Sequence, residues 1–370
     1  MINTKNWNLI LEKLYNKYGE NPDVFIMYRL TSEKLILDDY IIEYLISLTN
    51  VQKDALVNHN EKVVPHYSTC STLVAYLLGL SAINPLPPHY YCSDCKRIEF
   101  IDYDEKADSC LYDYEPCRKC NCGNTMKIDG FNIPFELYAP YDLKIKEKGV
   151  VPLKYSDYSE ELKRKFLNFP FLKSSQICHL LESSTGVMND DINFTDEFFK
   201  KRILNGNFIS RSNKINEFYN DVIKKVKPTN YNEFLKIIEF GHSIDAWKNN
   251  IEYVIEIENV KLSDIPVTKE DLYNLLYNRM INCLDNEYNT VEHKAINIAL
   301  KASKGYYFKN DMDSYTKEFL LNIGFDEWFI SYLSKIIYLP SKAMSVIEFK
   351  YILLLTWYDI YYKEEFKKVS

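Results

Sequence analysis

Apolar positions along the chain recur mainly at helical spacing. Apolar side chains return every three or four residues from Trp7 to Tyr18, and the same period runs from Leu35 to Leu48. From about residue 160 the helical pattern returns and continues to the tyrosine-rich stretch 342–362. This pattern predicts a protein made mostly of amphipathic helices.

Residues 96–135 interrupt the helical pattern. They are polar, acidic and rich in cysteine, and the stretches IEFIDYD and MKIDGFNIPFELY have the composition of short strands around turns. Directly before them, three prolines fall within residues 84–88. Proline fixes its own φ and disfavours helix in the residue before it, so we expect an extended arm that holds the following cysteines in place. The predicted fold class is therefore α+β, predominantly α-helical.

The composition indicates a large globular core. Of the 370 residues 46% are hydrophobic and 15% aromatic, while 52 acidic side chains outnumber 45 basic ones and give a net charge of −7. A protein that binds duplex DNA over a broad surface usually carries the opposite sign, because it must neutralise phosphates. The N-terminal stretch lacks the apolar block of a secretory signal, and no segment has the apolar length of a membrane span. We expect a cytoplasmic protein with no membrane contact.

The nine cysteines include two Cys-x-x-Cys pairs. Cys92 with Cys95 and Cys117 with Cys120 are separated by 21 residues, a spacing typical of a four-thiolate zinc ribbon, here at about residues 90–123. Four thiolates close the coordination shell, so the zinc would be structural and would leave no position for a catalytic water. Cys122 is an alternative ligand that can replace Cys117 or Cys120. The competing interpretation is that these cysteines pack without a metal.

Several stretches of the sequence resemble the α subunit of PolC-type DNA polymerase III. NPLPPHYYCSDCKRIEF and DGFNIPFELY are similar to the palm region of that family, and KPTNYNEFLKIIEFGHSIDAW and NIGFDEWFISYLSKIIYLPSKA resemble successive parts of its fingers region. The resemblance implies a palm-like region over residues 1–160, which contains the zinc ribbon, and a helical fingers-like region over residues 161–370. We expect no counterpart of the family's exonuclease or clamp-binding portions in this chain.

Neutral side chains occupy the positions that carry the catalytic aspartates of this family. The resemblance places Leu153, Tyr155 and Asn168 there. A polymerase uses carboxylates to hold two metal ions, and leucine, tyrosine and asparagine cannot form such a negative cage. We therefore expect no catalytic magnesium. Relocated ligands are the alternative, at Asp157 in a shifted register or at the adjacent pairs Asp38–Asp39 and Asp190–Asp191. We interpret these acids as parts of a solvated surface.

The phosphate-binding loop of the family is also altered. The family's Gly-Ser-x-Gly-Ser-Ser lets backbone N–H groups approach phosphates, whereas the matching residues 67–72 read Tyr-Ser-Thr-Cys-Ser-Thr. Ser68, Ser71 and Thr72 keep hydroxyl groups, but both glycines have become larger side chains that would occupy the phosphate site. These three residues are expected to be a remnant of the loop.

His242 and Asp245 match a histidine and an aspartate that lie near the incoming nucleotide in the family. The resemblance therefore implies a remnant of the nucleotide region at these two positions. A histidine and an aspartate one helical turn apart beside Trp247 also form an ordinary satisfied structural cluster, which explains the pair equally well.

Three functions are compatible with the sequence. The first is a catalytically inactive, replication-associated regulator or decoy that acts through protein contacts, which do not require a net positive charge. The second is a DNA-binding replication accessory of a plasmid or phage. The third is a DNA polymerase fragment whose carboxylates come from a partner chain. The sequence does not specify the partner or the oligomeric state.

Overall fold

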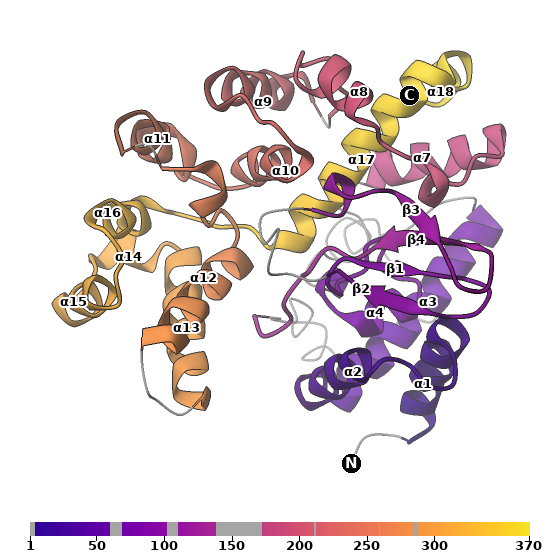
Figure 1. Ribbon diagram of the computed structural model, residues 1–370, viewed down its shortest axis with the longest axis horizontal. Coiled ribbons are helices and arrows are strands. Elements are labelled where there is room, and N and C mark those ends of the chain that lie inside the picture. The colour runs from indigo at the N-terminus through magenta and orange to yellow at the C-terminus, as the bar shows by residue number, and fades with distance from the viewer. Residues whose placement is uncertain are drawn as a thin grey trace. The chain divides into compact units, whose positions relative to one another are not determined.

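The computed structural model describes residues 4–59, 69–101, 110–137, 172–210, 212–258, 260–283 and 288–370. The chain divides into two compact units (Figure 1). Unit 1 contains residues 1–217 and 346–370, and unit 2 contains residues 218–345. The domain boundary that we expected near residue 160 lies outside the described residues.

Unit 1 begins with a cluster of helices that bury one apolar face each. These are α1 (Thr4–Tyr18), α2 (Val24–Ile36), α3 (Asp39–His59) and, after the short 3-10 helix η1 (Thr69–Ser71), α4 (Leu73–Leu77). Ile10, Leu14, Ile26 and Leu45 are fully buried between them. Burial of these side chains removes apolar surface from water, which is the main stabilising contribution to this part of the fold.

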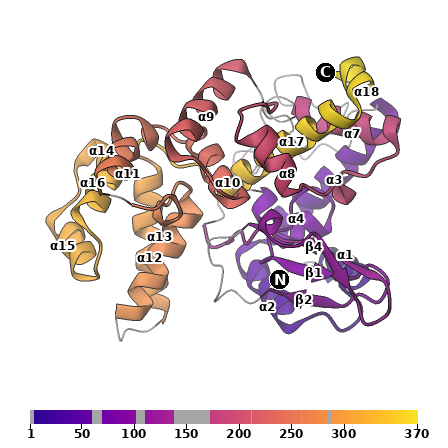
Figure 2. The same cartoon turned by 45° about the horizontal axis from the view of Figure 1, so that its top comes forward.

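A four-stranded antiparallel sheet lies against these helices (Figures 1 and 2). Its strands are β1 (His89–Tyr91), β2 (Ile98–Phe100), β3 (Cys117–Lys119) and β4 (Thr125–Asp129), in the order β2-β1-β4-β3. Tyr91, Ile98 and Phe100 pack on the helical core. Tyr90 and Met126 form a second, smaller core together with two of the cysteines.

The proline arm is not helical and docks on the segment that follows β4. The backbone N–H groups of Phe131, Asn132 and Ile133 donate to the carbonyls of residues 84, 86 and 85, all at 2.9 Å. Gly130 makes this approach possible, since its φ is +103° and an added Cβ would lie 2.3 Å from the carbonyl oxygen of Pro87. The arm therefore has a fixed position beside the sheet, as its prolines predict.

The rest of unit 1 comes from two distant parts of the sequence. Tyr358, near the end of the chain, donates from its hydroxyl to the carbonyl of Val187 at 3.0 Å and so joins the two parts. The elements are η3 (Leu111–Asp113), α7 (Leu172–Thr185), η6 (Asn189–Asp191), α8 (Asp196–Phe198), η7 (Phe199–Ile203), the part of α17 (Lys342–Tyr361) that follows residue 345, and α18 (Lys363–Val369).

Unit 2 is helical, and α12 packs along α13. Tyr332 anchors the unit because its buried hydroxyl donates to the carbonyl of Pro266 at 2.7 Å. The elements are α9 (Asn213–Val226, shared with unit 1), α10 (Tyr231–Phe240), η8 (Trp247–Ile251), α11 (Glu252–Glu258), η9 (Leu262–Asp264), α12 (Lys269–Cys283), α13 (Tyr288–Ser303), α14 (Tyr306–Asn310), α15 (Ser314–Asn322) and α16 (Glu327–Lys335).

The predicted fold class, α+β and predominantly α-helical, is confirmed. The sequence analysis did not predict α2 or the short strand β1, which is continuous with the proline arm. Within the part of the chain that the structure describes, no helix combines the length and apolar character needed to cross a bilayer.

Gly130→Ala tests the docking of the proline arm. We expect a loss of at least about 2 kcal/mol in the free energy of unfolding, because a side chain at this φ is strained and would also collide with the arm. The control is Gly79→Ala, which also has a positive φ but no atom within 4 Å of an added Cβ, and should cost only about 1 kcal/mol. Urea denaturation followed by circular dichroism measures both. Equal losses would contradict the close approach at Gly130.

Candidate functional site

Four cysteines gather at one end of the sheet. Cys92 follows β1 and Cys120 follows β3, and both strands run antiparallel to β4, so they run in the same direction and their carboxyl ends meet. Two tight turns bring in the other thiols. Lys96 donates its backbone N–H to the carbonyl of Cys92, which closes the turn around Cys95, and Gly123 donates to the carbonyl of Cys120, which closes the turn around Cys122.

The four thiols have the spacing of a tetrahedral metal site. Cys92 Sγ lies 3.6 Å from Cys122 Sγ, and Cys95 Sγ lies 3.4 Å from Cys120 Sγ. All four sulfur atoms lie within 4.8 Å of one another. Zinc–sulfur bonds of about 2.3 Å in a tetrahedron require sulfur atoms about 3.8 Å apart. The cluster can therefore hold a metal ion, and its all-thiolate donor set leaves no coordination position for water.

Backbone N–H groups favour the thiolate form at Cys92. Hydrogen bonds from the backbone of Cys95 and of Asp94 outweigh the effect of burial and lower the pKa of the Cys92 thiol from 9 to about 7. At Cys120 the N–H of Cys122 acts in the same sense, but burial and the neighbouring Cys95 thiol outweigh it and raise the pKa. N–H groups directed at sulfur are what a thiolate metal site requires, because the metal binds the deprotonated form.

Cys117 lies outside this cluster, and Cys122 takes the place that the sequence analysis first gave to it. Side chains alternate along a strand, so Cys117 in β3 points away from the face that Cys120 continues. Cys117 is exposed and pairs with Lys127 across the β3–β4 ladder. The expected ligand set therefore changes by one residue, through the exchange that the sequence had left open. Cys110 is buried, and burial raises the pKa of its thiol.

At the loop remnant, the N-terminus of α4 is already capped from within the protein. Thr72 accepts a hydrogen bond from the N–H of Ala75 at its hydroxyl oxygen, at 3.2 Å. The carboxylate of Glu33 accepts the N–H of Leu73 at 2.7 Å and that of Val74 at 3.0 Å. A carboxylate of the protein itself therefore binds the N–H groups at this helix N-terminus, a position that favours anions.

Arg29 fixes the buried carboxylate of Glu33. Its Nε donates to Glu33 at 2.7 Å, and its Nη2 donates to the carbonyls of Ser71 and Ile133, both at 3.0 Å. The guanidinium also lies over the ring of Phe135, 4.6 Å from its centre. Since Glu33 is fully buried and charge-paired, a phosphate could reach α4 only by displacing it and leaving Arg29 without its carboxylate. The sequence analysis did not identify Arg29 or Glu33. Their i,i+4 spacing on α2 is local, but the contact of Glu33 with Leu73 and Val74 joins residues 40 and 41 positions apart and forms only in the folded chain.

The other positions implied by the resemblance lie outside the described residues. These are Ser68 of the loop and the three positions of the catalytic aspartates, Leu153, Tyr155 and Asn168. In the described part of the chain, the thiol cluster is the one group of metal-ligating side chains close enough to share an ion. Ser71, the second hydroxyl residue of the loop, is buried and offers its carbonyl to Arg29.

In unit 2, His242 and Asp245 lie in different environments. His242 is buried, whereas Asp245 is exposed and has a φ of +58°. The carbonyl of Asp245 accepts a hydrogen bond from the Asn250 side chain at 2.8 Å, which closes the turn. Trp247 packs against Phe240 with ring centres 5.0 Å apart. His242 and Trp247 therefore lie in the core of unit 2, and the nucleotide-region role of His242 and Asp245 stays a prediction.

A buried charge network lies next to this segment and was not predicted. Lys236 pairs with both Glu239 and Asp271, and Lys342 pairs with Asp271 at 3.0 Å. Burial and the charge of Asp271 raise the pKa of Glu239 to about 8, although the two lysines oppose this. Burial also acts to raise the pKa of Asp271, but the two ammonium groups outweigh it and hold that pKa below its usual value.

Comparison with known proteins identifies the relatives of part of this chain. A DNA polymerase III PolC-type protein of Caldanaerobacter subterraneus is 36% identical over 137 residues, and one of Thermotoga maritima is 35% identical over 138 residues. One of Mycoplasmopsis pulmonis is 29% identical over 164 residues. The chain is a partial relative of PolC-type DNA polymerase III.

The relationship to PolC-type DNA polymerase III covers limited parts of both chains. The three matches cover 36% to 43% of this chain and only 9% to 11% of the relatives, so the chain spans about a tenth of their length. No family model matches the sequence. The resemblance to PolC-type polymerases is thereby confirmed as a partial one.

Cysteine-to-serine variants test the ligand set. Cys120→Ser is expected to weaken metal binding by about 100-fold or more, since even an outer-shell change at a metal site can cost 10- to 100-fold. Cys117→Ser is the matched control and should bind metal like the unmodified protein. Titration with Co²⁺, followed by its thiolate charge-transfer absorption, measures both. Loss of the signal in Cys117→Ser with retention in Cys122→Ser would contradict the observed cluster.

The raised pKa of Glu239 predicts a pH dependence of stability. In the folded protein Glu239 stays protonated up to about pH 8, whereas in the unfolded chain it loses its proton near pH 4.5. The free energy of unfolding therefore falls as the pH rises between these two values, by at most about 1.4 kcal/mol per pH unit. Lys236, Asp271, Lys342 and Tyr332 face this group.

Glu239→Gln should remove most of this slope in urea denaturation between pH 5 and pH 8. The exposed Glu318→Gln serves as the control and should leave the slope unchanged. An identical slope in Glu239→Gln and the unmodified protein would contradict the assignment.

Proposed function

We propose that this polymerase-related protein does not join nucleotides and acts in DNA replication through protein contacts, as a regulator or decoy in the cytoplasm. The observation that carries the proposal is the carboxylate of Glu33 at the N-terminus of α4. Nucleotidyl transfer needs a place for the triphosphate, and an internal anion there repels and excludes it.

The sequence of the catalytic positions supports the same proposal. Leu153, Tyr155 and Asn168 replace the aspartates that the PolC resemblance assigns to these positions. Phosphoryl transfer with two metal ions needs carboxylates that hold both ions close together, and neutral side chains cannot replace these carboxylates. In this proposal, the palm-like region of residues 1–160 and the fingers-like region of residues 161–370 keep the folding pattern of a polymerase without its reaction.

A structural zinc ion would stabilise the ribbon. We assign it to Cys92, Cys95, Cys120 and Cys122, because thiolates at tetrahedral spacing suit zinc. The small core around Tyr90 and Met126 contains few apolar side chains, so a bound metal would contribute much of the folding free energy of this segment.

The outer face of α2 supports a role in protein contacts. Val24, Tyr28 and Leu35 recur at helical spacing, and 81%, 66% and 85% of their respective surfaces are exposed. Large apolar side chains exposed on one helix are a common feature of surfaces that contact other proteins. The net charge of −7 is also compatible with a protein partner, whereas broad contact with DNA would require positive charge.

A DNA-binding accessory is the second candidate function. Basic side chains on the sheet favour it, since Arg97, Arg118, Lys119 and Lys127 are all exposed to a large extent. Arg97 and Arg118 pair with Glu99 and Lys127 pairs with Asp191, which reduces the charge available for phosphates. Binding to single- or double-stranded oligonucleotides that weakens steeply with salt would support this candidate over the first.

Primer extension tests the proposal. With Mg²⁺ or Mn²⁺ the purified chain is expected to add no nucleotide, while a PolC-type polymerase in the same assay extends the primer. Added to a PolC reaction that contains its replication proteins, the chain should slow extension, and an excess of those proteins should restore it. Extension by the chain alone would support the third candidate, an active polymerase fragment.

A double variant separates protein contact from other causes of inhibition. Val24→Ser with Leu35→Ser changes two exposed side chains, so the fold should persist while inhibition falls at least about tenfold. The matched control is Lys13→Gln on α1, which should inhibit like the unmodified protein. Full inhibition by the double variant would argue against α2 as the contact surface.

A further inference from the structure

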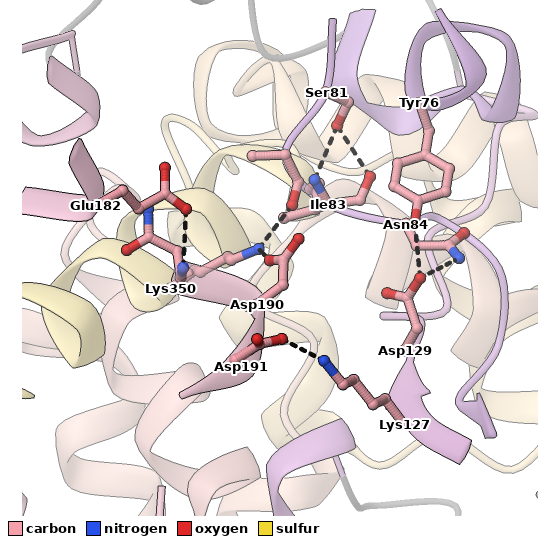
Figure 3. Close-up of polar contacts among 12 residues, drawn as sticks. Tyr76, Ser81, Ile83, Asn84, Lys127, Asp129, Glu182, Asp190, Asp191 and Lys350 are labelled. Atoms are coloured by element: carbon pink, nitrogen blue, oxygen red, sulfur yellow. Dashed lines mark hydrogen bonds and ion pairs between the residues drawn. The ribbon is translucent and has the colours of Figure 1, made fainter. Parts of the chain in front are cut away.

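Unit 1 contains a cavity of about 460 Å³ that none of the features above uses. Its walls come from α1, α4, β4 and η6, and from Lys350 in the part of α17 that belongs to unit 1. Figure 3 shows the polar residues of the wall that come from α4, β4, η6 and α17. Its volume lies within the range of pockets that bind small molecules. The charges inside it show what kind of molecule it fits.

Two of the three ammonium groups in the cavity wall are neutralised by neighbouring carboxylates. Lys350 donates to Asp190 and to the carbonyl of Ala82, both at 2.9 Å, and Lys127 pairs with Asp191 (Figure 3). These two ion pairs have no net charge. They contribute polarity but no strong preference for an anion or a cation.

Among the described residues, the remaining two charges in the wall, Lys17 and Asp129, have no partner of opposite sign. Asp129 accepts hydrogen bonds from the Tyr76 hydroxyl at 2.7 Å, the Asn84 amide at 2.8 Å and the Gly130 N–H at 2.9 Å, all of which are neutral donors (Figure 3). Lys17 lies over the rings of Tyr76 and Tyr91, at 4.6 and 5.2 Å from their centres. No carboxylate of the described residues lies within ion-pair distance of Lys17, and no cation lies within that distance of Asp129.

A single ring separates the two unpaired charges. Lys17 lies on the face of Tyr76, and Asp129 is bonded to the hydroxyl of the same tyrosine. The wall next to them is aromatic, because Tyr112 packs edge to face on Phe194 with ring centres 5.1 Å apart. The cavity thus offers a cation, an anion and an aromatic surface close together.

We propose that this cavity binds a free aromatic α-amino acid. Its carboxylate would pair with Lys17, its ammonium group would donate to Asp129, and its ring would pack against Tyr112 and Phe194. A zwitterion satisfies both unpaired charges and adds none, so each charge gains a charge-assisted hydrogen bond. The proposal rests on the cavity alone and is independent of the proposed function.

Mononucleotides fit the same charges poorly. A phosphate monoester would bring about two negative charges into a wall with three carboxylates, and only Lys17 is without a carboxylate partner there. A peptide terminus carries one of the two charged groups and would leave either Lys17 or Asp129 unpaired. These comparisons define the probes that test the proposal.

Cys117 provides a reporter inside the cavity. Its thiol is exposed, lies in the cavity wall and is outside the thiol cluster. Cys283 is also exposed but belongs to unit 2, so its reactivity serves as an internal control. The rate at which iodoacetamide alkylates each thiol in the zinc-loaded full chain can be followed by peptide mass spectrometry.

L-Tyrosine, L-phenylalanine or L-tryptophan at saturation is expected to slow alkylation of Cys117 at least about fivefold without changing the rate at Cys283. N-acetyl-L-tyrosine and L-tyrosinamide, which each lack one charge, should need at least about tenfold higher concentrations, because each loses one charge-assisted hydrogen bond. The proposal is overturned if none of the three amino acids protects Cys117, if the derivatives protect equally well, or if AMP protects better.

Variants locate the two contacts. Lys17→Gln should abolish most of the protection by L-tyrosine. It should change protection by L-tyrosinamide little, because the amide has no carboxylate to pair with Lys17. Asp129→Asn should weaken the protection of Cys117 by L-tyrosine. It should change protection by N-acetyl-L-tyrosine little, because that compound has no ammonium group to pair with Asp129. Lys13→Gln, on the same helix as Lys17, should behave like the unmodified protein. If Asp129→Asn does not fold, Lys17→Gln alone tests the proposal. Undiminished protection of Cys117 by L-tyrosine in Lys17→Gln would contradict it.

Discussion

The hydrogen bonds between the Glu33 carboxylate and the N-terminus of α4 join two distant parts of unit 1, in the segment for which the PolC resemblance implies a phosphate-binding loop. One side chain caps the helix, neutralises Arg29 and, through Arg29, ties the helix cluster to the carbonyls of Ser71 and Ile133. Ile133 belongs to the segment on which the proline arm docks. The same carboxylate therefore stabilises this part of unit 1 and, in the function proposed above, also excludes a phosphate.

The relationship to PolC-type DNA polymerase III and the internal anion lead to one account of the protein. Helices, arm and ribbon depend on burial, backbone hydrogen bonds and thiol geometry, and none of these needs catalytic carboxylates. The proposed loss of nucleotidyl transfer is therefore compatible with a stable fold that keeps surfaces for other proteins. The exposed apolar face of α2 and the net charge of −7 agree with that use.

Features that depend on local sequence were predictable. The helical period from Trp7 to Tyr18 matches α1, and the prolines of residues 84–88 determine a non-helical arm. The position of the thiol cluster followed from the cysteine spacing, but its four members did not. Choosing between Cys117 and Cys122 requires the direction of each side chain at the end of β3, and a spacing rule does not contain that information.

Features formed by distant residues were not predictable. Glu33 and Leu73 are 40 positions apart, and nothing in either local sequence indicates a buried cap. The cavity has the same origin, since Asp129 and Asp190 look like ordinary surface acids until β4 and η6 meet in unit 1. The prediction that Leu153, Tyr155 and Asn168 line an inactive site stays a prediction, because these residues lie outside the described part of the chain.

A crystal structure grown with a deoxynucleoside triphosphate and Mn²⁺ tests the central claim most directly. The account predicts that Glu33 still accepts the N–H groups of Leu73 and Val74 and that no phosphate density lies at the start of α4. A triphosphate bound there, with Glu33 displaced and Mn²⁺ held by carboxylates beside it, would contradict the account.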